Sequence, residues 1–331
     1  SGLYKEAIEM CEKSIEANSK NSYPLFLSGC CEYALKNYSS GISFLSKALE
    51  LDREEIYFSE RAKCKYEIGD YQSAIDDLTY AICLRRDRRY NYYWMAHCKY
   101  ELKDYKGAIE ELNIGINLEN EIDNDTCKSF LFWLRADCKY ILDDYLSAIN
   151  DCDKSIEINS ENSYFYFLRA ECKYELKNYD GALLDIEKAL NLNQHKHNEE
   201  IIYLRAYIKG DLGDLQGEME DLDEVININS SDPDYFQRRG LLKMILKKYQ
   251  SAINDFDQAL KLNPKDLISS RSKFHCSEAQ KAKDMIDSNE IKKVKFIIYE
   301  RFEILLKGIH YPYKKTEKDL EIFAILDDRE F

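Results

Sequence analysis

A cysteine, a lysine and a tyrosine stand side by side at Cys172, Lys173 and Tyr174. A thiol next to a basic amine is one arrangement that produces a nucleophile, because a nearby cation favours the reactive thiolate. The same trio occurs in stretches that closely match RAECKYELKNYDGA and contain Cys64, Cys98 and Cys138. A catalytic site is needed once, so a stretch that recurs at a fixed period is first of all a structural unit.

The recurring stretch belongs to a longer unit, which repeats about every 34 residues along the chain. In the unit that contains Cys172, Phe165 and Leu168 continue one apolar stripe with helical spacing, and Ala182 and Ile186 begin a second. Each second stripe carries a small residue near its start, at positions 7, 41, 74, 108, 148, 182, 218 and 252. Position 218 is the exception: it holds a glutamate preceded by Gly217, so the register of that unit stays open by one residue.

Helix pairs of this length, with small residues where the two helices cross, resemble the tetratricopeptide repeat. The matching small residues of the first helices are Gly29, Ala62, Ala96, Ala136, Ala170, Ala206 and Gly240. The resemblance covers residues 1–264 and implies an all-α fold, a right-handed α-solenoid of tandem helix-turn-helix repeats. The first repeat of this array is incomplete.

Residues 265–331 leave the repeat pattern and are expected to form a C-terminal helical cap or extension. Ser277 and Gln280 have the spacing of a capping box, and apolar residues trace a single stripe between 289 and 308. A solenoid needs a terminal element that covers the apolar face of its last repeat. A cap is therefore the first interpretation, and a separate partner-binding helix is the second.

Charge and hydropathy limit the classes of partner. The formal net charge of the 331 residues is −14, and the excess of acidic residues lies in 1–264, which disfavours nucleic acid. No apolar run approaches the length of a membrane span, so no membrane partner is expected and a cytoplasmic location is predicted. Ser1–Tyr4 correspond to the turn in the middle of a repeat, which predicts that the natural N-terminus, and any targeting signal with it, is missing.

Motifs for metal or cofactor chemistry are absent from the sequence. The 11 cysteines include no CxxC pair and no Cys/His cluster with zinc-ligand spacing, and the chain has neither a glycine-rich phosphate loop nor HExxH. We therefore expect no metal, no cofactor, no catalytic residue and no enzymatic activity. Five cysteines occupy one position of successive first helices, where they are expected to pack as small buried apolar groups: Cys31, Cys64, Cys98, Cys138 and Cys172.

Four arginines form the one dense basic cluster of the sequence, at Arg85, Arg86, Arg88 and Arg89. They follow a second helix, where cations offset the helix dipole. A contact with an acidic partner or a phosphate is the alternative.

The resemblance implies that the first helices line a concave channel with one tyrosine per repeat. These are Tyr33, Tyr66, Tyr100, Tyr140 and Tyr174. Further aromatic residues fall about one helical turn before them, namely Phe26, Tyr93, Trp133, Phe167 and Tyr203, and acidic residues directly after them, namely Glu67, Glu101 and Glu175. Aromatic side chains dominate binding hot spots, although packing between the helices is an equal alternative for any single ring.

This channel predicts a non-catalytic protein–protein interaction scaffold. Its ligand would be a peptide or helix of a partner protein, with apolar anchors for the rings and basic residues for the carboxylates. The alternative is an accessory or regulatory repeat region of an enzyme whose catalytic part lies outside this chain.

Overall fold

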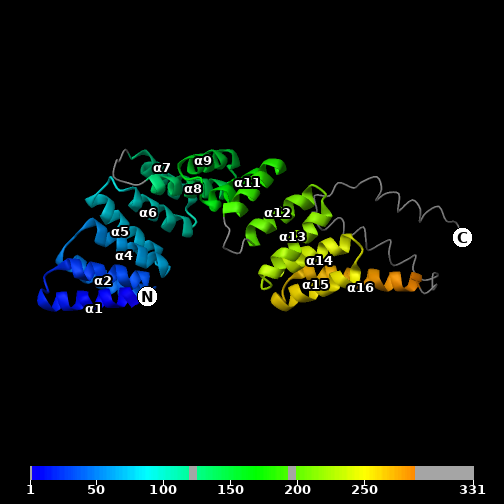
Figure 1. The fold of residues 1–331 in the computed structure, drawn as a ribbon, viewed down its shortest axis with the longest axis horizontal. Coiled ribbons are helices and arrows are strands. Elements are labelled where there is room, and N and C mark those ends of the chain that lie inside the picture. Colours follow the sequence, from blue (N-terminus) through cyan, green and yellow to red (C-terminus); the bar gives the residue numbers. More distant parts are fainter. Residues whose placement is uncertain (1, 119–124, 193–198, 288–331) are drawn as a thin grey trace. The chain divides into compact units, whose positions relative to one another are not determined.

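The computed structural model describes residues 2–118, 125–192 and 199–287. Within these ranges the chain forms 16 α-helices and no strand (Figure 1). Successive helices pair as first and second helices of a repeat, which confirms the predicted all-α solenoid.

The first helices are α2 (Ser22–Ala34), α4 (Glu55–Glu67), α6 (Arg89–Glu101), α8 (Asp125–Ile141), α10 (Ser163–Glu175), α12 (Glu199–Asp211) and α14 (Pro233–Ile245). The second helices are α1 (Gly2–Ala17), α3 (Tyr38–Leu51), α5 (Tyr71–Leu84), α7 (Tyr105–Asn117), α9 (Tyr145–Ile158), α11 (Tyr179–Leu192), α13 (Leu215–Ile228) and α15 (Tyr249–Leu262). A longer helix, α16 (Leu267–Asp287), follows them.

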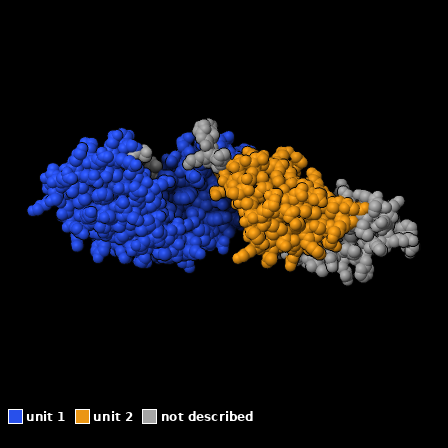
Figure 2. Space-filling model, turned by 90° about the horizontal axis from the view of Figure 1, so that it is seen from below, with its two compact units in different colours: residues 1–192 blue, residues 193–331 orange. Residues whose placement is uncertain are grey.

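The chain divides into two compact units, Ser1–Leu192 and Asn193–Phe331, which Figure 2 distinguishes by colour. The first unit contains α1 to α11 and the second contains α12 to α16. Within each unit, every helix packs against the helices that precede and follow it in the sequence. Contacts between elements close in sequence are the pattern expected of a repeat array.

A residue in the left-handed conformation follows the end of each first helix. Gly69 and Gly213 hold this place after α4 and α12, with φ of 81° and 83°. After the other first helices the same conformation is taken by Lys36, Lys103, Asp143, Lys177 and Lys247, with φ between 58° and 64°. Lys177 thus takes the place that Gly69 holds in the turn before Asp70.

Aspartates begin several of the second helices. The carboxylate of Asp104 accepts a hydrogen bond from the backbone N–H of Gly107 at 3.0 Å, and that of Asp214 accepts one from Gly217 at 2.9 Å. Such a side chain satisfies a backbone donor that the helix itself leaves unpaired. The caps therefore fix where α7 and α13 begin.

The start of α13 settles the register that the sequence left open. Glu218 is the fourth residue of this helix, as Ala74 is of α5, so it occupies the place of the small residue. The Glu218 side chain is nevertheless buried, with 1% of its surface exposed, and its Oε1 lies 2.6 Å from Nε of Arg238 on α14. A charged group is stable there because its partly buried counter-ion lies directly beside it.

The first helix of the tail, α16, begins at Leu267, directly after Asp266, and not near Ser277. The Asp266 carboxylate accepts hydrogen bonds from the backbone N–H groups of Ile268 and Ser269, at 2.9 and 3.2 Å. The helix continues past Ser277, whose hydroxyl donates to the backbone carbonyl of Lys273, so the expected Ser277–Gln280 capping box is wrong. A hydroxyl inside a helix can bond the preceding turn instead of starting a new helix.

The helix α16 packs on α15 as a first helix packs on the preceding second helix. Lys273 Nζ lies 2.5 Å from Asp257 Oδ1, which repeats the contact between Arg239 and Asp223 one unit earlier, at 2.7 Å. Cys276 is buried in a cluster with Phe256 of α15. The apolar stripe predicted for residues 289–308 lies outside the described residues.

Candidate functional site

The predicted channel tyrosines lie at the same position of successive first helices. Each half-buried ring contacts the tyrosine that opens the second helix of its own repeat, with ring centroids 5.4 to 5.9 Å apart. The five pairs are Tyr33–Tyr38, Tyr66–Tyr71, Tyr100–Tyr105, Tyr140–Tyr145 and Tyr174–Tyr179. We call these five first-helix residues the tyrosine row.

Members of the tyrosine row are joined to carboxylates of the next repeat. The Tyr33 hydroxyl donates to Glu67 Oε1 at 3.1 Å, and the Tyr66 hydroxyl donates to Glu101 Oε1 at 3.1 Å. Burial, together with the Glu101 charge, raises the pKa of Tyr66 well above its ordinary value. The structure thus brings predicted tyrosines and predicted glutamates together, as links between successive first helices.

Further along the row the carboxylates gather near Tyr140. Burial raises the pKa of its hydroxyl, and the charges of Glu171 and Glu175 raise it further. Asp137, on the same helix, has its own pKa raised by burial and is hydrogen-bonded to Tyr100. A ligand on α8 and α10 would therefore meet a negative field.

The other predicted aromatic residues differ in their surroundings. Trp133 packs against the core clusters on both sides of α8, and Phe26 stacks on Tyr57 with ring centroids 5.0 Å apart. These two contacts fit the alternative that the rings pack between helices. Phe167 is half-buried on α10. In the second unit, the rings of Tyr203 and Tyr235 are in contact, with centroids 4.7 Å apart.

Tyr93 belongs to an aromatic cluster on α6 that sequence reasoning largely missed. Its ring stands edge-on to His97, with centroids 4.5 Å apart, and Trp94 lies 5.8 Å from each of them. Burial lowers the pKa of His97 to about 4, so the imidazole is neutral at pH 7. The spacing of Tyr90, Trp94 and His97, one helical turn apart each time, was the signal for a shared face.

A second feature missed from the sequence is a set of buried ion pairs within the repeats. The Asp77 carboxylate of α5 accepts hydrogen bonds from two guanidinium nitrogens of Arg61 on α4, at 2.6 and 2.8 Å, and its Oδ2 lies 2.8 Å from Nζ of Lys65. We call this arrangement the aspartate clasp. It recurs at Asp151, Asp185, Asp221 and Asp255, each 16 residues after its arginine. The constant separation in the sequence was the available signal.

The lysines beside Cys64, Cys138 and Cys172 bind clasp aspartates, and Lys99 beside Cys98 pairs with Glu111, so carboxylates hold these ammonium groups and they do not activate the thiols. Cys64, Cys98, Cys138 and Cys172 are fully buried, and burial raises the pKa of each thiol to about 12. A thiol with such a pKa stays protonated at pH 7. The packing role is thus confirmed for these four, whereas Cys31 is only half-buried.

The arginine cluster does not form a free basic patch. Arg88 pairs with Glu55 at 3.1 Å, and Arg85 pairs with Asp87 at 3.0 Å. Arg89 is buried and donates to the backbone carbonyl of Leu118. Three of the four arginines thus have partners within the fold.

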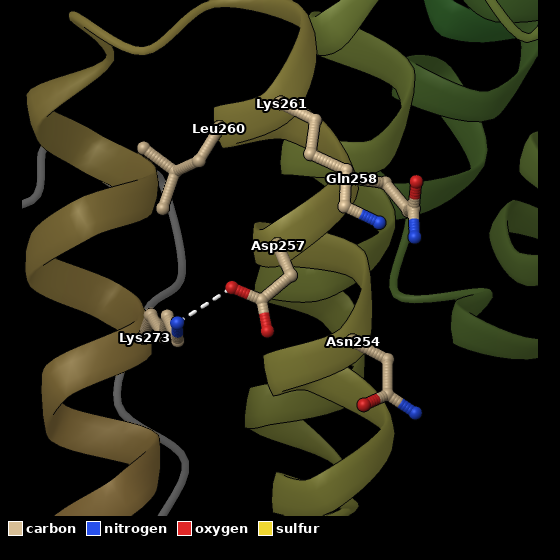
Figure 3. A pocket seen from close by; sticks show the side chains of 6 residues that line it. All are labelled: Asn254, Asp257, Gln258, Leu260, Lys261 and Lys273. Carbon is tan, nitrogen blue, oxygen red and sulfur yellow. Dashed lines mark ion pairs between the residues drawn. The ribbon is translucent and has the colours of Figure 1, made fainter.

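Neither a metal site nor a catalytic pocket stands out in the part of the chain that the structure describes. No three His, Cys, Asp or Glu side chains among the described residues are grouped so that they could hold a metal ion. Figure 3 shows a hollow between α15 and α16, crossed by the ion pair of Asp257 and Lys273. Its remaining lining is Asn254, Gln258, Leu260 and Lys261, which brings no nucleophile and base together. None of the described helices has the length and hydropathy needed to cross a membrane.

Comparison with known proteins assigns the repeat. Residues 233–266, from the start of α14 to Asp266, match the family model of the tetratricopeptide repeat. A tetratricopeptide repeat protein from Parabacteroides merdae superposes with a TM-score of 0.58 at 16% identity, over 78% of this chain and 99% of that chain. The chain thus contains a tetratricopeptide repeat at residues 233–266, and its fold is that of tetratricopeptide repeat proteins.

Two further solved structures extend the comparison of folds. The Cut9–Hcn1 hetero-tetramer of the APC/C gives a TM-score of 0.61 at 12% identity, over 82% of this chain and 52% of that chain. This chain therefore spans about half of that neighbour's length. The pilF protein of Pseudomonas aeruginosa gives 0.58 at 14% identity, over 66% of this chain and 96% of that chain. The sequence matches no curated protein.

Tetratricopeptide repeat arrays in general serve as scaffolds for protein–protein interaction, and proteins of this kind are generally non-catalytic. An array of stacked helix pairs exposes one helix of every repeat along a continuous surface, which suits extended ligands.

Proposed function

We propose that this tetratricopeptide repeat protein is a non-catalytic scaffold that holds a peptide or helix of a partner protein. The ligand lies along the first helices α2 to α10, in the groove that the tyrosine row lines. The observation that carries the proposal is the row itself: five half-buried tyrosines at one position of five successive first helices. Rigid aromatic surface of this kind provides contact area at a small cost in conformational entropy.

The chemistry of the partner follows from the residues around the row. Apolar anchors would pack beside Tyr93, Trp133 and Phe167, while Lys or Arg side chains would face Glu101 and Glu175. Glu101 already accepts a hydrogen bond from the Tyr66 hydroxyl. A basic group of the ligand would therefore share the Glu101 carboxylate with Tyr66. The Cut9–Hcn1 hetero-tetramer shows a protein complex formed on a related fold, which agrees with a protein ligand.

We further propose that residues 1–264 form the interacting array and that residues 265–331 form its C-terminal cap or extension. The packing of α16 against Phe256 of α15 supports the first part of this cap. A cytoplasmic location is proposed as well, since 11 cysteines, an odd number without zinc-ligand spacing, suit a reducing compartment.

The test uses a random peptide library displayed on phage and selected on the purified chain. Enriched peptides are expected to combine aromatic or aliphatic residues with Lys or Arg. In calorimetry, the double variant Tyr100→Ala/Trp133→Ala should weaken an enriched peptide by roughly 2–4 kcal/mol if both rings are hot spots. Tyr80→Ala is the matched control, because this tyrosine is exposed on a second helix.

Two outcomes would contradict the proposal. One is a selection that enriches no peptide. The other is a loss of affinity in Tyr80→Ala but not in the double variant, with circular dichroism showing that both variants keep their helices. The second result would place the ligand on the second helices.

A further inference from the structure

The ammonium group of Lys63 on α4 lies among three aromatic rings from neighbouring first helices. Its Nζ is 4.6 Å from the ring centroid of Tyr33 on α2, 5.5 Å from that of Tyr90 and 5.9 Å from that of Trp94, both on α6. Glu60 completes the surroundings, with Oε2 2.8 Å from Nζ. We call Tyr33, Tyr90, Trp94 and Glu60 the cation cage. A cation within about 6 Å of a ring centroid is attracted by the ring's electron-rich face.

The cage walls are held by contacts that do not involve Lys63. The Tyr33 hydroxyl is bonded to Glu67, and the Tyr90 hydroxyl donates to Glu60 Oε1 at 3.3 Å. Trp94 is packed against Tyr66, with centroids 5.3 Å apart, and also against Tyr93 and His97. The rings would therefore keep their places if the ammonium group left.

Lys63 itself has one described ion pair besides its ring contacts. The pair is with Glu60, three residues earlier on the same helix, and pairs of this type contribute little to stability. The lysine side chain is flexible and its ammonium is strongly hydrated in water. Its side chain is 14% exposed, so the group has a route to solvent.

The fold does not require a cation at this place. The equivalent position of the other first helices is occupied by Cys30, His97, Asp137, Glu171, Tyr207 and Leu241. A basic residue occurs only on α4, where rings of α2 and α6 surround it. The arrangement is thus local to these three helices and is not part of the repeat.

We propose that the cation cage is a binding site for an ammonium or guanidinium group of the partner, which Lys63 occupies in the unbound chain. When the partner's cation enters, Lys63 moves into solvent, so the charge of Glu60 remains neutralised throughout the exchange. Lys63 is then an internal competitor that selects for partners able to displace it. This inference rests on the proposed function, because it places an anchor point on the same first-helix surface.

A guanidinium group is the stronger of the two competitors. Its flat face covers an indole ring more fully than an ammonium group does, and it gives up less hydration on entering. A partner that presents arginine should therefore displace Lys63 more readily than one that presents lysine.

The experiment uses tetramethylammonium chloride as the probe, with sodium chloride at the same ionic strength as the reference. Trp94 fluorescence reports occupancy in a Trp133→Phe background, which leaves Trp94 as the single tryptophan. Lys63→Gln keeps a polar side chain that is one atom shorter and removes the positive charge from the cage. It should bind the probe roughly tenfold more tightly than the parent chain, as one released cation–π contact predicts. Lys99→Gln is the matched control, because Lys99 pairs with Glu111 and should leave probe binding unchanged.

A Lys63→Gln variant that keeps its helix content but binds the probe no better than the parent would overturn the proposal. Adding Glu60→Gln to Lys63→Gln should return the affinity towards the parent value, and a failure to do so would also count against the cage. The library-selected peptides separate this inference from the proposed function. If they bind the parent chain and their affinity is unchanged by Glu60→Gln, the scaffold stands and the cage is wrong.

Discussion

The carboxylate of Glu218 fills the space that a side chain at Gly210 would need. A Cβ added to Gly210 would lie 2.6 Å from Oε2 of Glu218 and 2.8 Å from a guanidinium nitrogen of Arg238. In the tyrosine row the equivalent position carries a ring, and the equivalent of Glu218 is a small residue. The unit that looked irregular in sequence thus exchanges a large and a small residue between its two helices.

Gly210→Ala should lower the free energy of unfolding by roughly 1–3 kcal/mol, because the added methyl group must displace a buried ion pair. In Glu218→Ala the carboxylate is gone and the end of the flexible Arg238 side chain can shift, so adding Gly210→Ala to that variant should cost much less. The measurement is a double-mutant cycle by urea denaturation. Equal costs of Gly210→Ala in the two backgrounds would show that Glu218 does not create the constraint.

Breaking an aspartate clasp should be more damaging than breaking the simpler pair of α6 and α7. Asp185→Ala leaves Lys173 without its carboxylate and leaves Arg169 with Asp153 alone, and loss of one partner of a buried pair costs about 3–5 kcal/mol. Because these cations are 18% and 19% exposed, water should reduce the cost towards the lower end. Glu111→Ala removes the partner of Lys99 alone and should cost about 1 kcal/mol or less.

Hydrogen exchange measured along the chain would check this order, since repeat arrays need not unfold in one step. Faster exchange in α10 and α11 of Asp185→Ala is the expected local effect. A larger loss of protection in Glu111→Ala would contradict the role given to the clasp.

His97 should make the chain less stable in mild acid. Burial lowers its folded pKa from 6.5 to about 4, so below pH 6.5 the unfolded chain takes up the proton more readily than the folded chain. Its contribution to the free energy of unfolding is complete above pH 6.5 and is lost as the pH falls towards 4, by roughly 1–3 kcal/mol. Burial raises the pKa of Asp137 and Glu218, which acts in the opposite direction.

The contribution of His97 is therefore the difference between wild type and His97→Gln, measured by urea denaturation from pH 7 to pH 4.5. The difference should shrink as the pH falls. A constant difference, or an NMR titration of the imidazole near pH 6.5, would show that the ring is not enclosed by Tyr93 and Trp94.

The buried cysteines should resist alkylation in the folded chain. Iodoacetamide at pH 7.5 is expected to modify exposed Cys83 first and to leave Cys98 and Cys172 unmodified until urea is added. Replacing Cys98 or Cys172 with Ala should lower the free energy of unfolding by about 1–2 kcal/mol through lost packing volume. Rapid modification of Cys172 in the native protein, followed by mass spectrometry, would contradict the packing role.

The helix pairs were predictable because each depends on residues close together in the sequence. Apolar spacing around Phe165 and Ala182 marks one pair, and its recurrence marks the rest. The start of α16 was missed because Asp266 and Ser277 are both residue types that can cap a helix, and the hydrogen bonds that make Asp266 the cap are seen only in the structure.

The surroundings of the site residues were much less predictable than the residues themselves. The tyrosine row was predictable because a tyrosine recurs at one position of the repeat. Its hydrogen bonds were not, since Glu101, which accepts from the Tyr66 hydroxyl, lies 35 residues away on another helix. The cation cage gives no repeating signal, since Lys63 is unique at its position and its rings come from α2 and α6. A periodic sequence pattern reveals the contacts that all repeats share, but it does not reveal a contact that occurs in one repeat only.

The aspartate clasp also determines where this chain can change in length. The separation of 16 residues between Arg135 and Asp151 is the same in every clasp, because both residues belong to one helical hairpin, the first and second helix of a single repeat. The link from Arg135 back to Asn113, by contrast, spans 22 residues, where the matching link from Arg169 to Asp153 spans 16. Extra residues have thus entered at the joint between two hairpins without disturbing either. A foreign loop or a whole folded module inserted at this joint should leave the neighbouring repeats intact, whereas one added residue within a hairpin would misalign arginine and aspartate.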